Sequence, residues 1–327
     1  MWRLLFLILF PVSLSAQLKR FEFPRIKMGS SFNIIFYHTD STQAVLIANE
    51  CYAMVDSFNN IFSDYSPASE VGRLADYTPL EAINVSNELY ELIVLSKQAW
   101  EKSYKTFDIT IGALTQLWRK AKAEKKFPAK EAIQQARAHT GFQYLSYDVF
   151  TRTITFKKPG IKLDFGGIVP GYLAQKIIDF LKSKNIHAAL VDASGDIVVS
   201  DPPPGKKGWT VAVNLPESED DVWDKKLELN NIAVSTSGDV YRYMMHDGKK
   251  YSHILDPRTG YGITSQRNVT VIHKYGAIAE WLAKACSILT VKKSLRLAKK
   301  QQAAVLIAIK KGKKIITFKT KNSDRYF

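Results

Sequence analysis

Cysteine is scarce in this sequence, which has only Cys51 and Cys286 among 327 residues. Two cysteines cannot form the disulfide framework that stabilises small secreted proteins. Each lies within an amphipathic helical pattern, so we expect both to be small side chains in the core. Nothing in the sequence requires a disulfide bond between them.

Long hydrophobic runs are absent beyond the first residues, and a membrane-spanning helix would need roughly 18 apolar residues in succession. The segment Met1–Ala16 is apolar at Leu4–Phe10, with Arg3 before this run, and it ends in small residues, as secretory signals do. We predict a cleavable signal over 1–17 and one folded domain over 18–327. The protein is then exported, to the periplasm, and no lipid anchor is expected because no cysteine lies near the cleavage site. The alternative is a buried N-terminal strand or helix.

The sequence also lacks a typical nucleic-acid-binding region, although its formal net charge is +15. Such a region would combine clustered basic residues with aromatic side chains. The lysines form scattered pairs instead, mostly at expected turns: Lys157-Lys158, Lys206-Lys207, Lys249-Lys250 and Lys310-Lys311. We therefore expect no nucleic-acid partner, and a cationic surface that suits an anionic membrane surface or a phosphorylated ligand.

Hydrophobic periodicity predicts both helices and strands. Ser31–His38 alternates like a strand, whereas Thr42–Phe62 has the spacing of an amphipathic helix. Ser86 is a typical N-cap for a helix that ends at Lys102, and Asp247-Gly248 is a typical hairpin turn. The other strands are expected at Ile161–Asp164, His187–Asp192, Asp196–Ser200, Trp209–Asn214, Asn231–Ser235, Val240–Met245, Lys250–Leu255, Ala303–Ile309 and Lys314–Phe318, and the other helices at Gly167–Ser183 and Gly276–Leu289.

These elements follow one another irregularly and include hairpins. We therefore predict an α+β fold of mostly antiparallel sheet flanked by helices, rather than a parallel doubly wound sheet. The sequence shows no internal repeat and no long linker, so we expect a single domain. The acidic stretch Glu217–Asp224 is interpreted as an exposed loop without a function.

Three segments place Gly, Asp, Ser, Thr and His between apolar runs, where a packed core would not select them. Asp164–Tyr172 ends a strand and opens a helix, whose free N–H groups would suit a phosphate. Ser235–Asp239 leaves a strand and could offer hydroxyl and amide donors to a nucleotide, although its residues also suit an ordinary turn. For Asp164–Tyr172, a tight turn with a purely structural role is an equally good interpretation.

The third segment is Tyr251–Gly260, in which His253 lies at a strand end just before a turn. An imidazole in that place is the natural base for activating a hydroxyl group near neutral pH. A single histidine is more often a satisfied polar residue, but the polar neighbours of His253 favour the functional interpretation.

In their order and spacing, these segments resemble the motifs of the ApbE-type FAD:protein FMN transferases. The family motifs DLGGIAKGY, GGD, TSGD and SHILDPRTG correspond here to Asp164–Tyr172, Ser194–Asp196, Thr236–Asp239 and Ser252–Gly260. Earlier positions that also resemble the family are Met28–Ser30, Phe62–Pro67, Ser69-Glu70, Phe107–Gly112 and Leu117-Trp118. The resemblance extends from about residue 25 to residue 290.

The resemblance implies a T-fold-like catalytic domain that transfers FMN from FAD to a Ser or Thr of an exported flavoprotein and releases AMP. It implies that His253 is the base that takes the proton of the acceptor hydroxyl. The residues that it assigns to the FAD site are Met28, Tyr65, Thr106, Phe107, Asp108, Asp164, Thr236, Ser237, Gly238 and Ile254.

The resemblance also implies Mg²⁺, which would compensate the charge of the FAD pyrophosphate. The family helix motif ADALATA places an Asp and a Thr four residues apart as metal ligands, whereas this chain has Glu280 and Lys284 there. Gly167 and Glu280 remain as implied ligands, but a protonated lysine cannot bind a metal. The glycine-rich turn differs as well, with Val169–Gly171 in place of AKG and Gln175 in place of an Asp.

These departures lead to a hypothesis, in which the Lys284 ammonium takes the magnesium position and holds the FAD pyrophosphate without metal. Such a protein would bind FAD in the presence of EDTA but would transfer FMN slowly or not at all. The alternative to a transferase is therefore a non-catalytic FAD-binding or partner-binding relative with a degenerate magnesium site.

Overall fold

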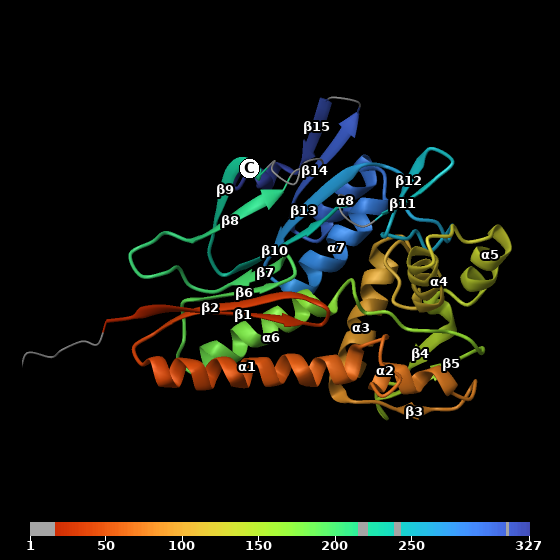
Figure 1. Ribbon diagram of the computed structural model, residues 1–327, viewed down its shortest axis with the longest axis horizontal. Helices are drawn as coiled ribbons and strands as arrows, with labels where there is room; N and C mark the ends of the chain where they lie inside the picture. Colours follow the sequence, from red (N-terminus) through yellow and green to blue (C-terminus); the bar gives the residue numbers. More distant parts are fainter. Residues whose placement is uncertain (1–16, 215–221, 239–242, 312–313) are drawn as a thin grey trace, which may run out of the picture.

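A large antiparallel sheet forms the centre of the molecule (Figure 1). The computed structural model describes residues 17–214, 222–238, 243–311 and 314–327. Within these residues the sheet has eight strands in the order β1-β2-β6-β7-β10-β13-β14-β15. Their bounds are β1 Lys19–Lys27, β2 Ser30–His38, β6 Ala189–Ala193, β7 Asp196–Val199, β10 Ile232–Ser237, β13 Arg267–His273, β14 Ala304–Lys311 and β15 Lys314–Lys319. The α+β prediction with a mostly antiparallel sheet is confirmed.

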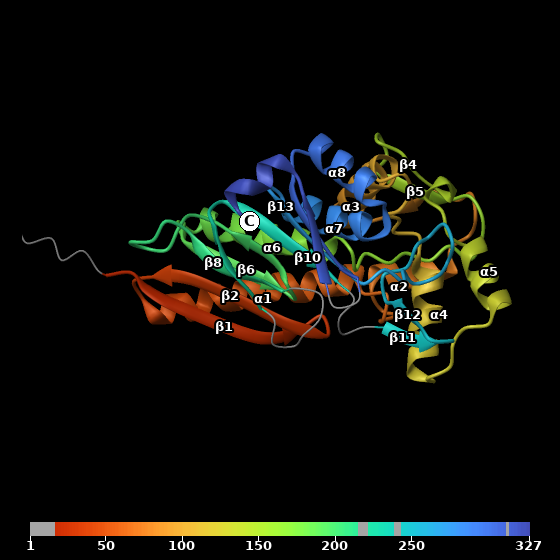
Figure 2. The same ribbon diagram turned by 90° about the horizontal axis from the view of Figure 1, so that it is seen from above.

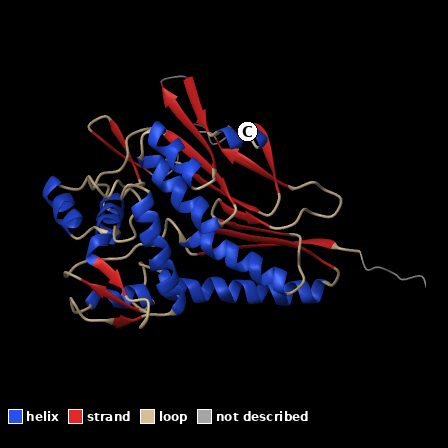
Figure 3. Ribbon diagram, turned by 180° about the vertical axis from the view of Figure 1, so that it is seen from behind, coloured by secondary structure: helices blue, strands red, loops and turns tan. Residues whose placement is uncertain are grey.

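Helices cover one face of this sheet and a hairpin covers the other (Figures 2 and 3). The helices on the first face are α1 (Ser41–Phe62), α6 (Val169–Ser183), α7 (Gly276–Ile288) and α8 (Val291–Lys300). The hairpin on the second face is β8 (Trp209–Asn214) with β9 (Val222–Leu229). Alternate side chains of β2 face the two layers, because Phe32 and Phe36 belong to the helix-side core and Ile35 packs with Trp209.

A second group of elements lies beside the end of α1 (Figure 1). It consists of α2 (Glu70–Arg73), α3 (Asn87–Lys102), α4 (Gly112–Ala123), α5 (Lys130–Ala138) and a small sheet of β3 (Ile83–Asn84), β5 (Thr153–Phe156) and β4 (Leu145–Tyr147). Short 3-10 turns complete it at Leu74–Asp76 and Phe142–Tyr144, and another such turn, Lys321–Arg325, follows β15. Most of its buried side chains join the helix-side core, so the two groups pack together.

The two long helices that periodicity predicted begin at capping side chains. The Asp40 carboxylate accepts hydrogen bonds from the amides of Thr42 and Gln43 at the start of α1. The Ser86 hydroxyl accepts one from Leu89 at the start of α3, at 3.3 Å. Both helices end as predicted, at Phe62 and Lys102.

The hairpin turn at Asp247-Gly248 is confirmed. Strand β11 (Tyr243–His246) pairs with β12 (Lys249–Ser252), and both turn residues have positive φ, 48° and 70°. This backbone form matches the twist of the flanking strands, which is why Asp-Gly favours it.

Several predicted strands differ in the structure. Within the described residues Ile161–Asp164 forms only one bridge, from Lys162 to Ile111, and no strand. The strand expected over Lys250–Leu255 ends at Ser252, because the chain turns at the polar box that follows. A loop was predicted at Glu217–Asp224. Residues 217–221 lie outside the described residues, whereas residues 222–224 form the start of β9 and not a loop.

Cys51 in α1 and Cys286 in α7 are buried, as predicted, and both are free thiols. The predicted signal over 1–17 lies almost wholly outside the described residues. In the described part of the chain, no helix combines the length and the apolar character needed to cross a membrane.

Candidate active site

The glycine-rich segment Asp164–Tyr172 bends back on itself before α6. The Asp164 carboxylate accepts a hydrogen bond from the Gly166 amide at 2.8 Å. In the first turn of α6 the Gly171 amide donates to Oε2 of Glu280 at 2.7 Å. The prediction of free N–H groups at this helix start is therefore wrong for Gly171, because a carboxylate from α7 already occupies that donor.

Helices α6 and α7 approach each other closely where two glycines meet. A Cβ atom at Gly171 would lie 2.5 Å from the carbonyl oxygen of Gly276, and one at Gly276 would clash with the Gly171 carbonyl. The absence of both side chains thus brings the start of α6 against the start of α7. This contact places Glu280, one turn into α7, beneath the glycine-rich segment.

A buried group of charges lies next to this crossing. Glu280 is completely buried and Asp196, the first residue of β7, is 8% exposed. Burial raises the pKa of Glu280 well above its usual range, and Asp196 raises it further, whereas Lys284 and the Gly171 amide lower it. Burial also raises the pKa of Asp196, against the Lys284 charge and a hydrogen bond from the Ser235 hydroxyl.

Lys284 lies one helical turn beyond Glu280 and is half-buried. Its aliphatic stem passes beside the glycine-rich segment, because a Cβ atom at Gly167 would lie 3.4 Å from Cγ of Lys284. The same atom would lie 3.3 Å from the Phe107 ring, which packs against Trp281 of α7 with ring centres 6.3 Å apart. Gly167, Phe107 and α7 are therefore neighbours.

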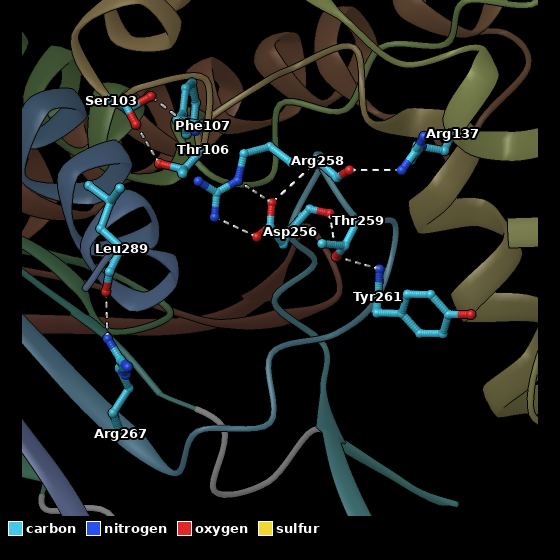
Figure 4. A network of polar contacts seen from close by, with 10 residues as sticks. All are labelled: Ser103, Thr106, Phe107, Arg137, Asp256, Arg258, Thr259, Tyr261, Arg267 and Leu289. Atoms are coloured by element: carbon cyan, nitrogen blue, oxygen red, sulfur yellow. Dashed lines mark hydrogen bonds and ion pairs between the residues drawn. The ribbon is translucent and has the colours of Figure 1, made fainter. Parts of the chain in front are cut away.

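The turn Thr106–Asp108 is held by its own hydrogen bonds. The Thr106 hydroxyl donates to the Ser103 carbonyl oxygen at 2.7 Å (Figure 4). The buried Asp108 carboxylate accepts from the amide and hydroxyl of Thr110 and from the Phe142 amide. Burial raises the pKa of Asp108 despite these donors. Asp108 therefore fixes the loop, and its contact with a flavin stays a prediction.

Tyr65 lines a small cavity of about 210 Å³ together with Asp64, Gln116 and Lys162, among others. The charge of Asp164 acts on Asp64. Arg119 of α4 donates to both carboxylate oxygens of Asp64, and its guanidinium lies 4.1 Å from the centre of the Tyr65 ring. The Tyr65 ring is 78% exposed, so it could stack on a planar ligand.

Four further predicted flavin residues lie on or directly beside strands of the large sheet. Met28 forms the β1–β2 turn with an uncommon positive φ of 52° and packs against the helix-side core. Thr236 and Ser237 are the last two residues of β10, and the Thr236 hydroxyl pairs with that of Thr270 at 3.1 Å. Gly238 follows them directly, and a Cβ atom there would clash with the Asn268 side chain. Asp239 of the same motif lies outside the described residues.

The box Ser252–Gly260 leaves β12 and turns toward α4 and α5. The buried Ser252 hydroxyl accepts a hydrogen bond from the Ile254 amide, so the exposed His253 lies between two buried residues. The Asp256 carboxylate holds the Arg258 guanidinium at 2.7 Å and also accepts from the Arg258 amide (Figure 4). Trp118 donates to the Gly260 carbonyl oxygen at 2.9 Å, which fixes the far end of the box on α4.

A larger hollow of about 560 Å³ adjoins the β11–β12 hairpin, close in sequence to His253. Its lining is mainly polar and includes Lys249, Lys250, Thr264 and Gln266. The hollow lies along the hairpin, and His253 is not among its lining residues.

Comparison with known proteins supports the resemblance. Residues 28–307, well over half of the chain, match the sequence profile of the ApbE family. The chain belongs to the ApbE family.

Named relatives and solved structures agree with this assignment. The FAD:protein FMN transferase of Chlamydia muridarum is 29% identical over 295 residues, which cover 88% of this chain and 90% of the relative. The apo form of the flavinyl transferase ApbE of Pseudomonas stutzeri has a TM-score of 0.83 and 29% identity, and the match covers 95% of this chain and 97% of that one. The ApbE protein of Thermotoga maritima has a TM-score of 0.84 and 28% identity over 94% and 99% of the two chains.

The magnesium site implied by the ApbE family does not fit the residues of this chain. Of the implied ligands, Glu280 uses one oxygen to hold the Gly171 amide, and only Oε1 is without a hydrogen-bond partner among the described residues. The stem of Lys284 lies beside Gly167, and its ammonium has no lone pair for a metal and repels cations. Nowhere in the described ranges do three His, Cys, Asp or Glu side chains gather as metal ligands.

Sequence reasoning missed Arg119 and the buried environment of Asp196 in this ApbE-family site. Arg119 orders Asp64 and Tyr65, and the only signal for it was its place just after the matching Leu117-Trp118 pair. Asp196 was recognised only as part of a motif, because its buried interaction with Glu280 joins two segments more than 80 residues apart.

Proposed function

We propose that this protein is an FAD:protein FMN transferase, which moves FMN from FAD onto a Ser or Thr side chain of a protein. The observation that supports this most directly is the placement of His253. It is an exposed imidazole directly after β12, within a box that Trp118 and Asp256 hold in shape. Relatives of this chain carry the name FAD:protein FMN transferase, which describes a transfer of the same kind.

The reaction breaks the pyrophosphate bond of FAD. The acceptor hydroxyl oxygen attacks the phosphorus atom of the FMN half, and the phosphoester bond to the protein forms while AMP leaves with the bridging oxygen. His253 takes the proton of the hydroxyl, which makes the oxygen a better nucleophile. The residues of this chain then have to orient the two substrates and to balance the charge of the pyrophosphate.

Two groups of residues suit the binding of FAD. Tyr65 offers an exposed aromatic face, whose position Arg119 fixes, and this face suits a planar ring system. Near α7, Lys284 offers a positive charge beside Gly167 and Phe107. Because the donor set does not fit Mg²⁺, the proposal assigns no step to a metal ion.

The acceptor is proposed to be an exported flavoprotein, and the site of action the periplasm. Support comes from the signal-like sequence at the N-terminus and from the nature of the reaction, which needs a protein hydroxyl as its second substrate. The cationic surface would also allow contact with an anionic membrane surface.

The test is transfer in vitro. Incubating the protein with FAD and a purified exported acceptor flavoprotein should increase the acceptor mass by one FMN residue, measured by mass spectrometry. The His253→Ala variant should lower the transfer rate by roughly 10²–10⁴-fold, the usual range for loss of a general base. His246→Ala is the matched control, because His246 is an exposed histidine on the same hairpin, and its rate should equal that of the unmodified protein.

Two results would contradict parts of this proposal. If the acceptor mass stays unchanged while FAD binds, the protein is a flavin-binding relative without transferase activity. If His253→Ala and His246→Ala transfer FMN equally fast, His253 is not the base.

A further inference from the structure

Helix α7 carries two opposite charges on the face that meets α6 and the sheet. Glu280 and Lys284 are four residues apart, so their side chains lie on the same side of the helix. The proposed transfer uses His253 and the substrates, and it leaves the buried carboxylate of Glu280 without a chemical role. We therefore looked for a positively charged group near Glu280 that could balance the charge of its carboxylate.

The position of Glu280 is fixed by the helix that it meets. Its Oε2 accepts a hydrogen bond from the Gly171 amide, and the contact of Gly171 with Gly276 leaves little room for the carboxylate to move away. Its Oε1 is also buried and has no hydrogen-bond partner in the described part of the chain. Burial favours the neutral acid at such a place, so the ionised form of Glu280 needs a positive charge close by.

Asp196 increases this need. It is buried at the start of β7, where Ser235 donates a hydrogen bond to it, and its charge acts on Glu280. Two buried acidic side chains from different elements are thus close enough for the charge of one to act on the other. In many proteins such a pair would bind a divalent cation.

Lys284 supplies the positive charge from the chain itself. Its charge acts on both Asp196 and Glu280, and its stem lies against the position of Gly167. Lys284 is half-buried, so part of it remains in contact with solvent. The stem of Lys284 thus lies beside the glycine-rich segment, and its charge acts on two buried carboxyl groups.

We propose that Lys284 is a built-in counter-ion that replaces a divalent metal ion in this site, so that the protein binds the pyrophosphate of FAD without magnesium. This inference rests on the proposed function for the identity of the ligand. A lysine and a divalent cation cannot share the space, because like charges repel in a poorly solvated site. The chain should accordingly be a metal-independent member of its family with respect to flavin binding.

The first test needs no variant. FAD is titrated into the purified full-length protein, once with Mg²⁺ and once with EDTA, and the dissociation constant is measured from the change in flavin fluorescence. We expect the two constants to agree within about twofold, which is a small difference on the affinity scale. Binding that is lost in EDTA and restored by Mg²⁺ overturns the inference but leaves the proposed function intact. Absence of FAD binding in both buffers contradicts the proposed function itself.

The second test removes the counter-ion. In Lys284→Thr the carboxylates of Asp196 and Glu280 keep their places, and the new hydroxyl can serve as a metal ligand. We expect FAD binding by this variant to weaken at least about tenfold in EDTA and to recover with Mg²⁺. Lys292→Thr is the matched control, because Lys292 is an exposed lysine on α8, and it should bind FAD like the unmodified protein in both buffers.

A separate measurement follows the metal directly and does not depend on flavin. Mn²⁺ serves as the probe, and its free concentration is measured by electron paramagnetic resonance. The unmodified protein should leave Mn²⁺ free, whereas Lys284→Thr should bind about one equivalent. Tight Mn²⁺ binding by the unmodified protein would show that Lys284 does not exclude the metal. If Lys284→Thr does not fold, the EDTA and Mn²⁺ measurements on the unmodified protein still decide the question.

Discussion

At the scale of single residues, Cys51 and Cys286 give a direct measure of core integrity. Burial raises the pKa of each thiol to about 12. The thiolate is the reactive form, so neither thiol should react with iodoacetamide in the native protein near neutral pH. Mass spectrometry should detect two carbamidomethyl groups after unfolding in guanidinium chloride and none before. Ser183→Cys, on the exposed end of α6, is the positive control and should be labelled at once in the native state.

The same pKa shifts predict how stability depends on pH. The folded state holds both thiol protons more tightly than the unfolded chain, so their contribution to the free energy of unfolding is complete below the unfolded pKa of about 8.5. The contribution of the two thiols decreases as the pH rises from about 8.5 toward 12. Substituting both cysteines with alanine should remove this part of the alkaline loss of stability, and an unchanged alkaline profile would contradict the assignment.

Residue patterns predicted where the site would be but not what each side chain does there. The box with His253 was recognised because polar and turn-forming residues interrupt an apolar pattern. By contrast, Asp108 turns its carboxylate to Phe142, and Glu280 turns its own to Gly171. These contacts join segments far apart in the chain, and no local rule of sequence contains them.

At the scale of elements, the crossing of α6 and α7 depends on Gly171. Alanine normally stabilises a helix relative to glycine by about 0.5–1 kcal/mol. At this position the added methyl group would lie 2.5 Å from the Gly276 carbonyl oxygen, so the two helices would have to move apart. We expect Gly171→Ala to lower the free energy of unfolding by roughly 1–3 kcal/mol, the usual cost of overpacking.

The measurement is denaturant unfolding followed by circular dichroism. Gly166→Ala serves as the control, because a Cβ atom there would meet only the flexible Asp164 side chain, at 3.1 Å. Its stability should change by less than that of Gly171→Ala. A Gly171→Ala variant as stable as the unmodified protein would mean that the helices do not depend on this contact.

Elements with strong periodicity were predicted well, and short or polar ones were not. The spacing of Thr42–Phe62 located α1 within one residue, because 22 residues offer six turns of repeating pattern. Strands β3, β4 and β5 have only two to four residues each, too few for alternation to be recognised. Strand β9 begins in the acidic stretch that suggested a loop, and its pairing with β8 overrides that composition.

At the scale of the whole molecule, the site is formed where the large sheet and the smaller group of elements meet. The sheet and its helices contribute Asp196, Glu280 and Lys284, whereas the smaller group contributes Phe107 and Tyr65. The contact of Phe107 with Trp281 joins the two parts. A substrate bound between Tyr65 and α7 would touch both, so FAD should stabilise the complete fold rather than one part of it.

The net charge of +15 and the isoelectric point near 9.5 lead to a prediction for the complete protein. Each lysine near an anionic bilayer contributes about 1 kcal/mol of attraction, so scattered lysine pairs should together give measurable membrane binding. In flotation experiments the protein should bind vesicles that contain phosphatidylglycerol at 0.1 M salt. It should dissociate near 1 M salt, where the screening length has fallen from about 10 Å to about 3 Å. Vesicles of phosphatidylcholine alone are the control, and equal binding to them would show that apolar contacts, not charge, hold the protein at the surface.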